Sequence, residues 1–239
     1  MKLEKHQRVS ASISDTSANL SVVGIFQVVQ DAVTELMGEL HIDGITARDK
    51  YSAVWVFVRT RIKLLKNIPW GKDGFDTFAF ITSITRATLC IDVELKNKAG
   101  ERCVYARVEI CGLDLKTGKI RKVETIGVDD KIKIEPATAQ LDFTHFDNVQ
   151  LSAIENVQVK STSIDFSHHT NNAEYVRFIM NTYAVEQLEK RPVKEMEVRY
   201  VNQSFENDVL TVCKGSFEGK DIVVINKDDK TIAKSEIVF

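Results

Sequence analysis

Residues 165–175 read Asp165-Phe166-Ser167-His168-His169-Thr170-Asn171-Asn172-Ala173-Glu174-Tyr175. A carboxylate, a hydroxyl and an imidazole occupy alternate positions, and two asparagines then open a segment with helical apolar spacing. If the first five residues are extended, Asp165, Ser167 and His169 share one face, because successive side chains of a strand point to opposite faces. They would then lie beside the positive end of the following helix. This combination suits attack on a carbonyl group.

Two long amphipathic helices are predicted, one in each half of the chain. The first spans about residues 21–40, where apolar residues recur at helical spacing and Ser21 is a suitable N-cap. The second spans about residues 172–189. Segments typical of strands, separated by turn residues, follow each helix. They are 51–65, 76–95, 101–115 and 119–126 in the first half, and 196–204, 208–216, 221–226 and 231–239 in the second.

The two halves match locally at an offset of 150 residues. Ser14-Asp15-Thr16-Ser17 corresponds to Ile164-Asp165-Phe166-Ser167, and Asn19 stands in the place of His169. Each half therefore reads as one long helix covering an antiparallel meander, which predicts an α+β fold made of two tandem copies. Poor periodicity over about 131–157, together with Pro136, marks the connection. We expect an N-terminal domain at 1–135, a linker at 136–156 and a C-terminal domain at 157–239 that carries the chemistry.

The composition excludes several classes of protein. The chain is 44% hydrophobic and 28% charged with a net charge of -2, so a nucleic-acid-binding surface is not expected. The start lacks a secretory signal, and no apolar stretch is long enough to span a bilayer. Four cysteines without CxxC spacing indicate reduced packing residues in a cytoplasmic protein. Nothing in the sequence calls for a metal or another cofactor.

Three patches resemble the acyl-acyl carrier protein thioesterases. They are Gln30-Asp31-Ala32, the run Ile62-Lys63-Leu64-Leu65-Lys66-Asn67-Ile68-Pro69-Trp70-Gly71-Lys72, similar to that family's strand and Pro-x-Trp-Gly turn, and His169-Thr170-Asn171-Asn172-Ala173-Glu174-Tyr175, similar to its His-x-Asn-Asn-x-x-Tyr segment. The resemblance implies a double hotdog fold, in which each unit is a long central helix wrapped by an antiparallel sheet. It also implies hydrolysis of acyl-acyl carrier protein to free fatty acid. Because no plastid extension precedes the first expected strand, the chain resembles the bacterial members.

The resemblance assigns catalytic positions one by one. Asp165 and His169 match the aspartate and histidine of the family, whereas Ser167 replaces an asparagine. Further along, Gln203 replaces a glutamate and Ser204 a cysteine. Glutamine can orient a water molecule but cannot take its proton at neutral pH, so the replacement favours Asp165 as the group that activates water or attacks the thioester.

The remaining groups have supporting roles in this hypothesis. His169 would hold Asp165 or the water and protonate the leaving thiolate. Backbone amides at the start of the second helix, at Asn171, Asn172 and Ala173, would stabilise the oxyanion. Ser167 can still hold a water molecule, and Ser204 is a possible secondary contributor. Gln203 and Ser204 are neighbours in a strand, so at most one of them faces the site, and the family position favours Gln203.

Simpler interpretations of the same residues remain open. Asn171 and Asn172 could serve only as helix caps. Asp165 and His169 could form a purely structural pair, a Ser-His-Asp triad could form within the segment, or His168 and His169 could bind a metal, although neighbours in a strand point apart. The whole chain could also be an acyl-CoA thioesterase on the same scaffold, or an acyl-binding protein that lost its chemistry.

The substrate is expected to occupy the first copy. By resemblance, residues around the first helix set the acyl chain length, and Val29, Ala32, Val33 and Leu36 would line the acyl slot. Acyl carrier protein is acidic, so the row Arg59, Arg61, Lys63 and Lys66 is a candidate docking surface. Hotdog units often pair, so a homodimer is possible.

Overall fold

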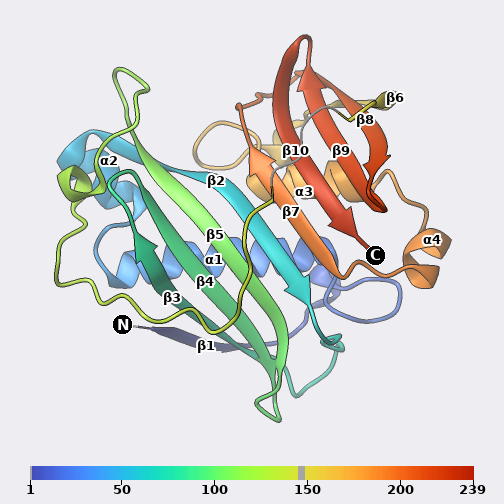
Figure 1. Cartoon of the computed structure of the whole chain (residues 1–239), viewed down its shortest axis with the longest axis horizontal. Coiled ribbons are helices and arrows are strands. Elements are labelled where there is room, and N and C mark those ends of the chain that lie inside the picture. Colours follow the sequence, from blue (N-terminus) through green and yellow to red (C-terminus); the bar gives the residue numbers. More distant parts are fainter. Residues whose placement is uncertain (1, 145–148) are drawn as a thin grey trace. The chain divides into compact units, whose positions relative to one another are not determined.

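The structure is a computed structural model that describes residues 2–144 and 149–239 (Figure 1). The chain divides into two compact units, Met1–Leu141 and Asp142–Phe239. Each unit combines an antiparallel sheet with few helices, so the α+β class is confirmed. Within the described residues, no helix has both the length and the apolar character needed to cross a membrane.

Helix α1, Val22–Glu39, is the long helix predicted for the first unit. Ser21 caps it, since its side chain accepts a hydrogen bond from the amide of Gly24 at 2.9 Å. The apolar stripe is buried, and α1 packs against strands β1, β3 and β4 (Figure 1). The helical spacing of apolar residues therefore located this element correctly.

The sheet of the first unit has the strand order β1-β3-β4-β5-β2. Its strands are β1 Leu3–Gln7, β2 Ala53–Leu64, β3 Phe75–Ile84, β4 Thr88–Asn97 and β5 Arg102–Asp114. The strand predicted at 76–95 is wrong as a single element, because the chain turns between β3 and β4. The hydroxyl of Thr85 accepts hydrogen bonds from the amides of Ala87 and Thr88 at this turn.

Two further segments of the first unit differ from the prediction. Residues 119–126 are not a strand: Ile120 makes one bridge to Leu113, and a 3-10 helix, η2, then covers Val123–Ile126. Helix α2, Gly44–Tyr51, was not predicted. Of its residues only Ala47 is buried, so it has no apolar stripe to recognise.

The second unit repeats the topology of the first. Its elements are β6 Ser152–Gln158, α3 Asn172–Met180, α4 Val185–Lys190, β7 Glu195–Tyr200, β8 Val209–Phe217, β9 Lys220–Lys227 and β10 Lys230–Val238. The strand order is β7-β10-β9-β8-β6, which is the order of the first unit read in the opposite direction. Helix α3 contacts β9 of this sheet.

The second helix is shorter than predicted. Residues 172–189 form α3 and α4 rather than one helix, with a turn between them. Thr182 turns its hydroxyl back to the carbonyl of Ile179 at 2.8 Å, and Tyr183 donates to Asp221 of β9 at 2.9 Å. The side chain of Gln187 then accepts from the amide of Ala184 and starts α4. These tertiary and capping hydrogen bonds interrupt the single helix that the spacing of apolar residues predicted.

Strand β6 begins inside the segment 136–156 that was interpreted as a linker and ends two residues beyond it. It pairs with β8 in an antiparallel register from Ser152 to Gln158. Nearly all of its residues are exposed, so the alternation that reveals a half-buried strand is missing. Both β1 and β6 end their strand orders, and such edge strands are hard to recognise from sequence for this reason.

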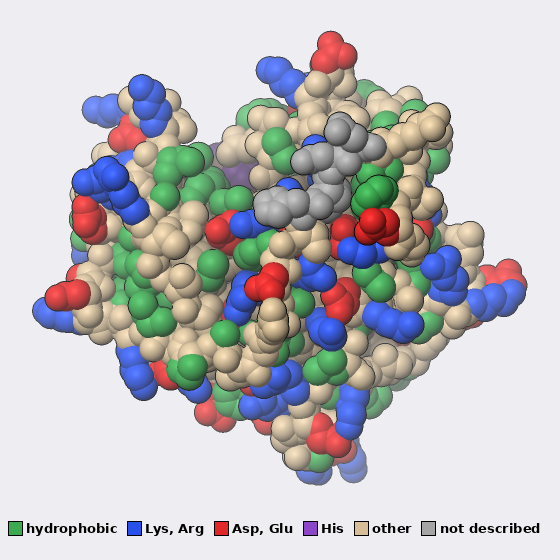
Figure 2. Space-filling view, in the orientation of Figure 1, with side chains coloured by type: hydrophobic (Ala, Val, Ile, Leu, Met, Phe, Trp, Pro, Cys, Tyr) green, Lys and Arg blue, Asp and Glu red, His purple; other side chains and the backbone are tan. Residues whose placement is uncertain are grey.

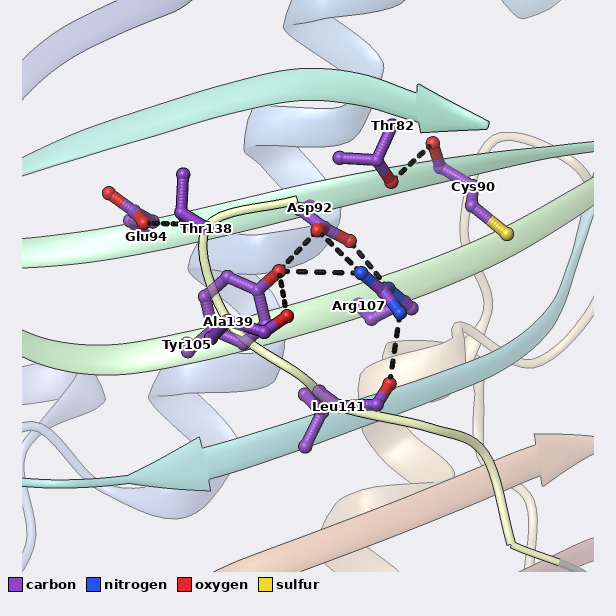
Figure 3. A network of polar contacts seen from close by, with 9 residues as sticks. All are labelled: Thr82, Cys90, Asp92, Glu94, Tyr105, Arg107, Thr138, Ala139 and Leu141. Atoms are coloured by element: carbon purple, nitrogen blue, oxygen red, sulfur yellow. Dashed lines mark hydrogen bonds and ion pairs between the residues drawn. The ribbon is translucent and has the colours of Figure 1, made fainter. Parts of the chain in front are cut away.

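A buried polar network joins β4 and β5 of the first unit to the segment that follows Glu135. Figure 3 shows Asp92 at its centre, between Arg107 and Tyr105, on the side of the sheet away from α1. Asp92 is completely buried and accepts two 2.8 Å bonds from Arg107, as well as a bond from the hydroxyl of Tyr105. These bonds to Asp92 raise the pKa of Arg107, which therefore remains charged.

The segment over this network is held by its own polar bonds. Arg107 donates to the carbonyl of Leu141 at 3.3 Å, and the hydroxyl of Thr138 donates to Glu94 (Figure 3). Burial would raise the pKa of Glu94, but the bonds from Thr138 and Lys96 lower it overall. We call residues 138–141 the strap.

Candidate active site

The segment Asp165–His169 is a tight turn, so the extended conformation predicted for it is wrong. The amide of Asp165 donates to the carbonyl of His169 at 3.2 Å, and the amide of His168 donates to the carbonyl of Asp165 at 3.0 Å. His168 has a φ of 65°, and Ile164 bridges Thr170 at the base. The contacts between polar side chains in this segment therefore come from hydrogen bonds within the turn, not from the alternation of a strand.

The carboxylate of Asp165 is the acceptor around which this turn is built. One oxygen accepts from the amide of Ser167 at 2.9 Å and from the Ser167 hydroxyl. The other oxygen accepts from the side-chain amide of Asn171 at 3.2 Å. Short polar residues commonly fold their own backbone in this way. Asp165 and Ser167 are therefore in direct contact through the turn rather than through a shared strand face, and both remain partly accessible to solvent.

The same turn occurs in the first unit, 150 residues earlier. The amide of Asp15 donates to Asn19 O at 2.8 Å, and its carboxylate accepts from the amides of Ser17 and Asn19. Ala18 has a φ of 56°, matching the left-handed conformation of His168. The local repeat read from the sequence is thus present in the backbone. What differs is the chemistry, because Asn19 occupies the position of His169.

His169 follows Asp165 at the other end of the turn and is half-buried. Its ring nitrogen Nδ1 lies 3.4 Å from the carbonyl oxygen of Thr170. In the part of the chain that the structure describes, no hydrogen bond joins the His169 and Asp165 side chains. The Ser-His-Asp triad that the sequence left open as an alternative is therefore not assembled here. Nor do the described residues contain a group of three or more side chains suited to hold a metal ion.

The start of α3 offers fewer amides than the sequence indicated. The amide of Asn171 donates to Ser163 O at 2.9 Å, and that of Ala173 donates to the capping side chain of Asn171 at 2.9 Å. Asn171 is therefore a cap. Of the three amides proposed for an oxyanion, only that of Asn172 has no hydrogen-bond partner among the described residues.

Gln203 and Ser204 follow strand β7 and differ sharply in exposure. Gln203 is exposed, whereas Ser204 is completely buried. The hydroxyl of Ser204 contacts Thr170 Oγ1 at 2.7 Å and the Tyr175 hydroxyl at 2.9 Å. The roles of Thr170 and Tyr175 in this cluster were not predicted. At the offset of 150 residues, Thr170 corresponds to Leu20 and Tyr175 to Ile25. This change from apolar to polar residues is the sequence signal that could have revealed the cluster.

The four residues predicted to line an acyl slot are buried in the first unit. Val29, Ala32, Val33 and Leu36 are at most 3% exposed, on the face of α1 that packs on the sheet. A surface hollow of about 420 Å³ in this unit is lined by none of them. It lies between the β3–β4 turn and residues 123–134.

The predicted basic row is partly neutralised. Arg59 lies 2.7 Å from Glu109 on the neighbouring strand, and Lys66 lies 2.7 Å from Glu101. On the face drawn in Figure 2, basic and acidic side chains are interspersed. A surface of one charge sign would steer an acidic partner more strongly than such a mixture.

Models of one protein family match both units. The model described as the acyl-ACP (acyl carrier protein) thioesterase N-terminal domain matches residues 2–135, and the model of the C-terminal domain matches residues 146–238. The chain belongs to the acyl-ACP thioesterase family. This thioesterase is accordingly an acyl-ACP hydrolase, with acyl-ACP as its substrate partner.

Solved structures agree with this family in their fold. The chain is similar to an acyl-ACP thioesterase from Bacteroides thetaiotaomicron, with 16% identity, a TM-score of 0.85, and coverage of 100% of this chain and 97% of that one. It is also similar to a putative oleoyl thioesterase from Lactobacillus plantarum, with 14% identity, a TM-score of 0.80, and coverage of 99% and 95%. It is similar as well to a 12:0-ACP thioesterase from Umbellularia californica, with 13% identity, a TM-score of 0.78, and coverage of 99% of this chain and 96% of that one. No curated protein matches this thioesterase in sequence.

Proposed function

We propose that the two units are tandem hotdog copies and that the second one carries the hydrolytic chemistry of the enzyme. The shared strand order and the repeated turn at an offset of 150 residues support the duplication. The observation that carries the assignment is the turn of Asp165. It holds an accessible carboxylate beside the start of α3, whereas the first copy lacks the histidine.

In this proposal Asp165 acts as the base. It takes a proton from water, and the resulting hydroxide attacks the thioester carbonyl carbon. The amide of Asn172, at the positive end of α3, donates to the oxyanion. When the carbon–sulfur bond breaks, His169 gives a proton to the thiolate of the carrier arm, and free fatty acid is released. Direct attack by Asp165, which would form a transient anhydride, uses the same residues.

Ser167 and Gln203 would complete the site. The hydroxyl and amide of Ser167 hold one oxygen of Asp165 and leave the second oxygen with Asn171, which orients the carboxylate. Gln203 is exposed and would orient the attacking water through its side-chain amide. Ser204 is completely buried, so it acts through its neighbours.

Replacing Gln203 with glutamate is expected to raise kcat about tenfold at neutral pH, because a carboxylate can share the work of deprotonating water. The gain should grow as the pH rises above about 4.3, where glutamate ionises. Steady-state hydrolysis of acyl-ACP measures the effect. Asn202→Asp is the control, since it adds the same charge on a side chain that donates to Thr231 O. A kcat for Gln203→Glu no higher than that of the unmodified enzyme would argue against this placement of water.

The acyl chain is proposed to occupy the first copy, along the buried face of α1. Leu36→Ala would then deepen the slot and shift the released fatty acids toward longer chains. The chain-length profile of free fatty acids in a bacterial host is the readout. Ile25→Ala, on the same buried stripe, should have a similar stability cost of about 2–5 kcal/mol without changing the profile. Identical profiles for the two variants would place the acyl chain elsewhere.

Acyl-ACP docking is proposed to involve the row Arg59, Arg61, Lys63 and Lys66, of which the first three alternate along β2 and so share a strand face. A cytoplasmic location is part of the proposal, because all four cysteines are free. A homodimer is a further possibility of this fold.

A further inference from the structure

Three hydroxyl groups form a closed cluster behind the turn of Asp165. Thr170, Tyr175 and Ser204 are each no more than 2% exposed. Ser204 Oγ lies 2.7 Å from Thr170 Oγ1 and 2.9 Å from the Tyr175 hydroxyl. The amide of Ser204 donates to that same hydroxyl at 3.1 Å, and Thr170 Oγ1 donates to the carbonyl of Ser204 at 3.0 Å. The hydroxyls are sealed from substrate.

One assignment of hydrogens satisfies the whole cluster. Thr170 donates to the carbonyl of Ser204, Ser204 donates to Thr170, and Tyr175 donates to Ser204 while accepting from its amide. Burial raises the pKa of Tyr175, so its proton is present at neutral pH. Directional bonds of this kind hold two loops at a fixed separation more strictly than apolar contacts do.

The first copy shows that the fold does not require these hydroxyls. There the amide of Leu20 donates to the carbonyl of Ile68 at 2.8 Å. This bond corresponds to the one from the backbone amide of Thr170 to the carbonyl of Ser204 at 2.9 Å. Leu20, Ile25 and Ile68 thus occupy the three positions, and all are buried. Replacing a satisfied polar cluster with apolar side chains of similar shape can be nearly neutral or stabilising. The first copy folds with the apolar set, so a role other than folding is sought for the polar set in the second copy.

We propose that Thr170, Tyr175 and Ser204 are positioning residues that hold Gln203 in a fixed place relative to the turn of Asp165. Thr170 follows His169 and bridges Ile164, so it forms the base of that turn. Ser204 follows Gln203 directly, and the two bonds to its carbonyl tie the loop of Gln203 to the same base. This inference rests on the proposed function, since it gives Gln203 the water-orienting role.

Tyr175→Phe tests the proposal most directly. It removes the donor to Ser204 Oγ and the acceptor of the Ser204 amide, so the loop of Gln203 keeps only the bonds from Thr170 and is held less strictly. We expect kcat for acyl-ACP to fall about 10–100-fold, because small displacements of a reacting group have effects of this size. KM should stay within about twofold, since the hydroxyls do not touch substrate.

Tyr183→Phe is the matched control. It makes the same change in the same unit and removes the bond to Asp221, far along the chain from the turn. The melting temperatures of the two variants should fall by similar amounts, while only Tyr175→Phe loses kcat. Equal kcat values for the two variants would reduce the cluster to a structural role and overturn the proposal.

A double-mutant cycle with Gln203→Ala separates positioning from a general loss of activity. If the cluster acts through Gln203, Tyr175→Phe changes kcat less than about twofold once Gln203 is absent. Losses that simply multiply would overturn the proposal. Asp165→Asn, assayed alongside, tests the proposed function separately: an active Asp165→Asn enzyme refutes that function, whereas an inactive one with multiplying losses refutes only the positioning role.

Discussion

Asp165→Asn is expected to lower the kcat for acyl-ACP hydrolysis by about 10²–10⁴-fold, the range in which a positioned general base contributes. Asparagine keeps the shape of the side chain and an oxygen that can accept from the amide of Ser167. It loses the charge and the ability to take a proton from water. The folded structure should therefore persist while the chemistry stops. Release of free fatty acid from purified acyl-ACP, with the same acyl group on CoA assayed in parallel, measures the change.

The first copy provides an internal control for this experiment. Asp15→Asn alters the equivalent carboxylate, which accepts from the amides of Ser17 and Asn19 in the same kind of turn. The cost in stability should resemble that of Asp165→Asn, and kcat should be unchanged. If Asp165→Asn hydrolyses acyl-ACP within a few-fold of the unmodified enzyme, the base is a different residue.

Arg107→Met is expected to destabilise the first unit by about 3–5 kcal/mol, because it leaves the buried charge of Asp92 without its bidentate partner. Among the described residues, Tyr105 is then the side chain that still donates to that carboxylate. Both tryptophans, Trp55 and Trp70, belong to the first unit. Urea unfolding followed by tryptophan fluorescence therefore reports on this unit.

Two further variants show whether the loss arises from the unpaired charge. Lys66→Met breaks an ion pair whose side chains are about half exposed, so its cost in stability should be far smaller than that of Arg107→Met. Combining Arg107→Met with Asp92→Leu removes both charges and should recover much of the lost stability. A single Arg107→Met variant that unfolds at the urea concentration of the unmodified protein would contradict this account of the network.

The elements that could be predicted are those whose pattern comes from local packing. Helix α1 has a continuous apolar stripe and a serine cap, so both its type and its start were correct. Helix α2 and the edge strands β1 and β6 bury almost nothing and show no period. The break between α3 and α4 depends on Tyr183 reaching Asp221 in a strand 38 residues away.

The candidate site named from the sequence stays a prediction, and its geometry could not be derived from the sequence. The local segment predicted that Asp165, Ser167 and His169 share one face of a strand, whereas turn hydrogen bonds fold the backbone and join only the side chains of Asp165 and Ser167. The cluster behind the turn joins Thr170 to Ser204, which lies 34 residues later in the sequence. The local periodicity of side chains does not predict contacts over such a sequence separation. Asn171 and Ala173 have amides already used within the protein, which only coordinates reveal.

The strap has a practical consequence for dividing the gene. A fragment stopping at residue 135, where the family model of the first domain ends, would encode a sheet in which the guanidinium of Arg107 and the phenol of Tyr105 lose the carbonyl groups of Leu141 and Ala139. The ion pair of Arg107 and Asp92, now buried, would then be exposed to water. Separate expression, or domain exchange with a relative, should keep every residue through Leu141 on the first piece.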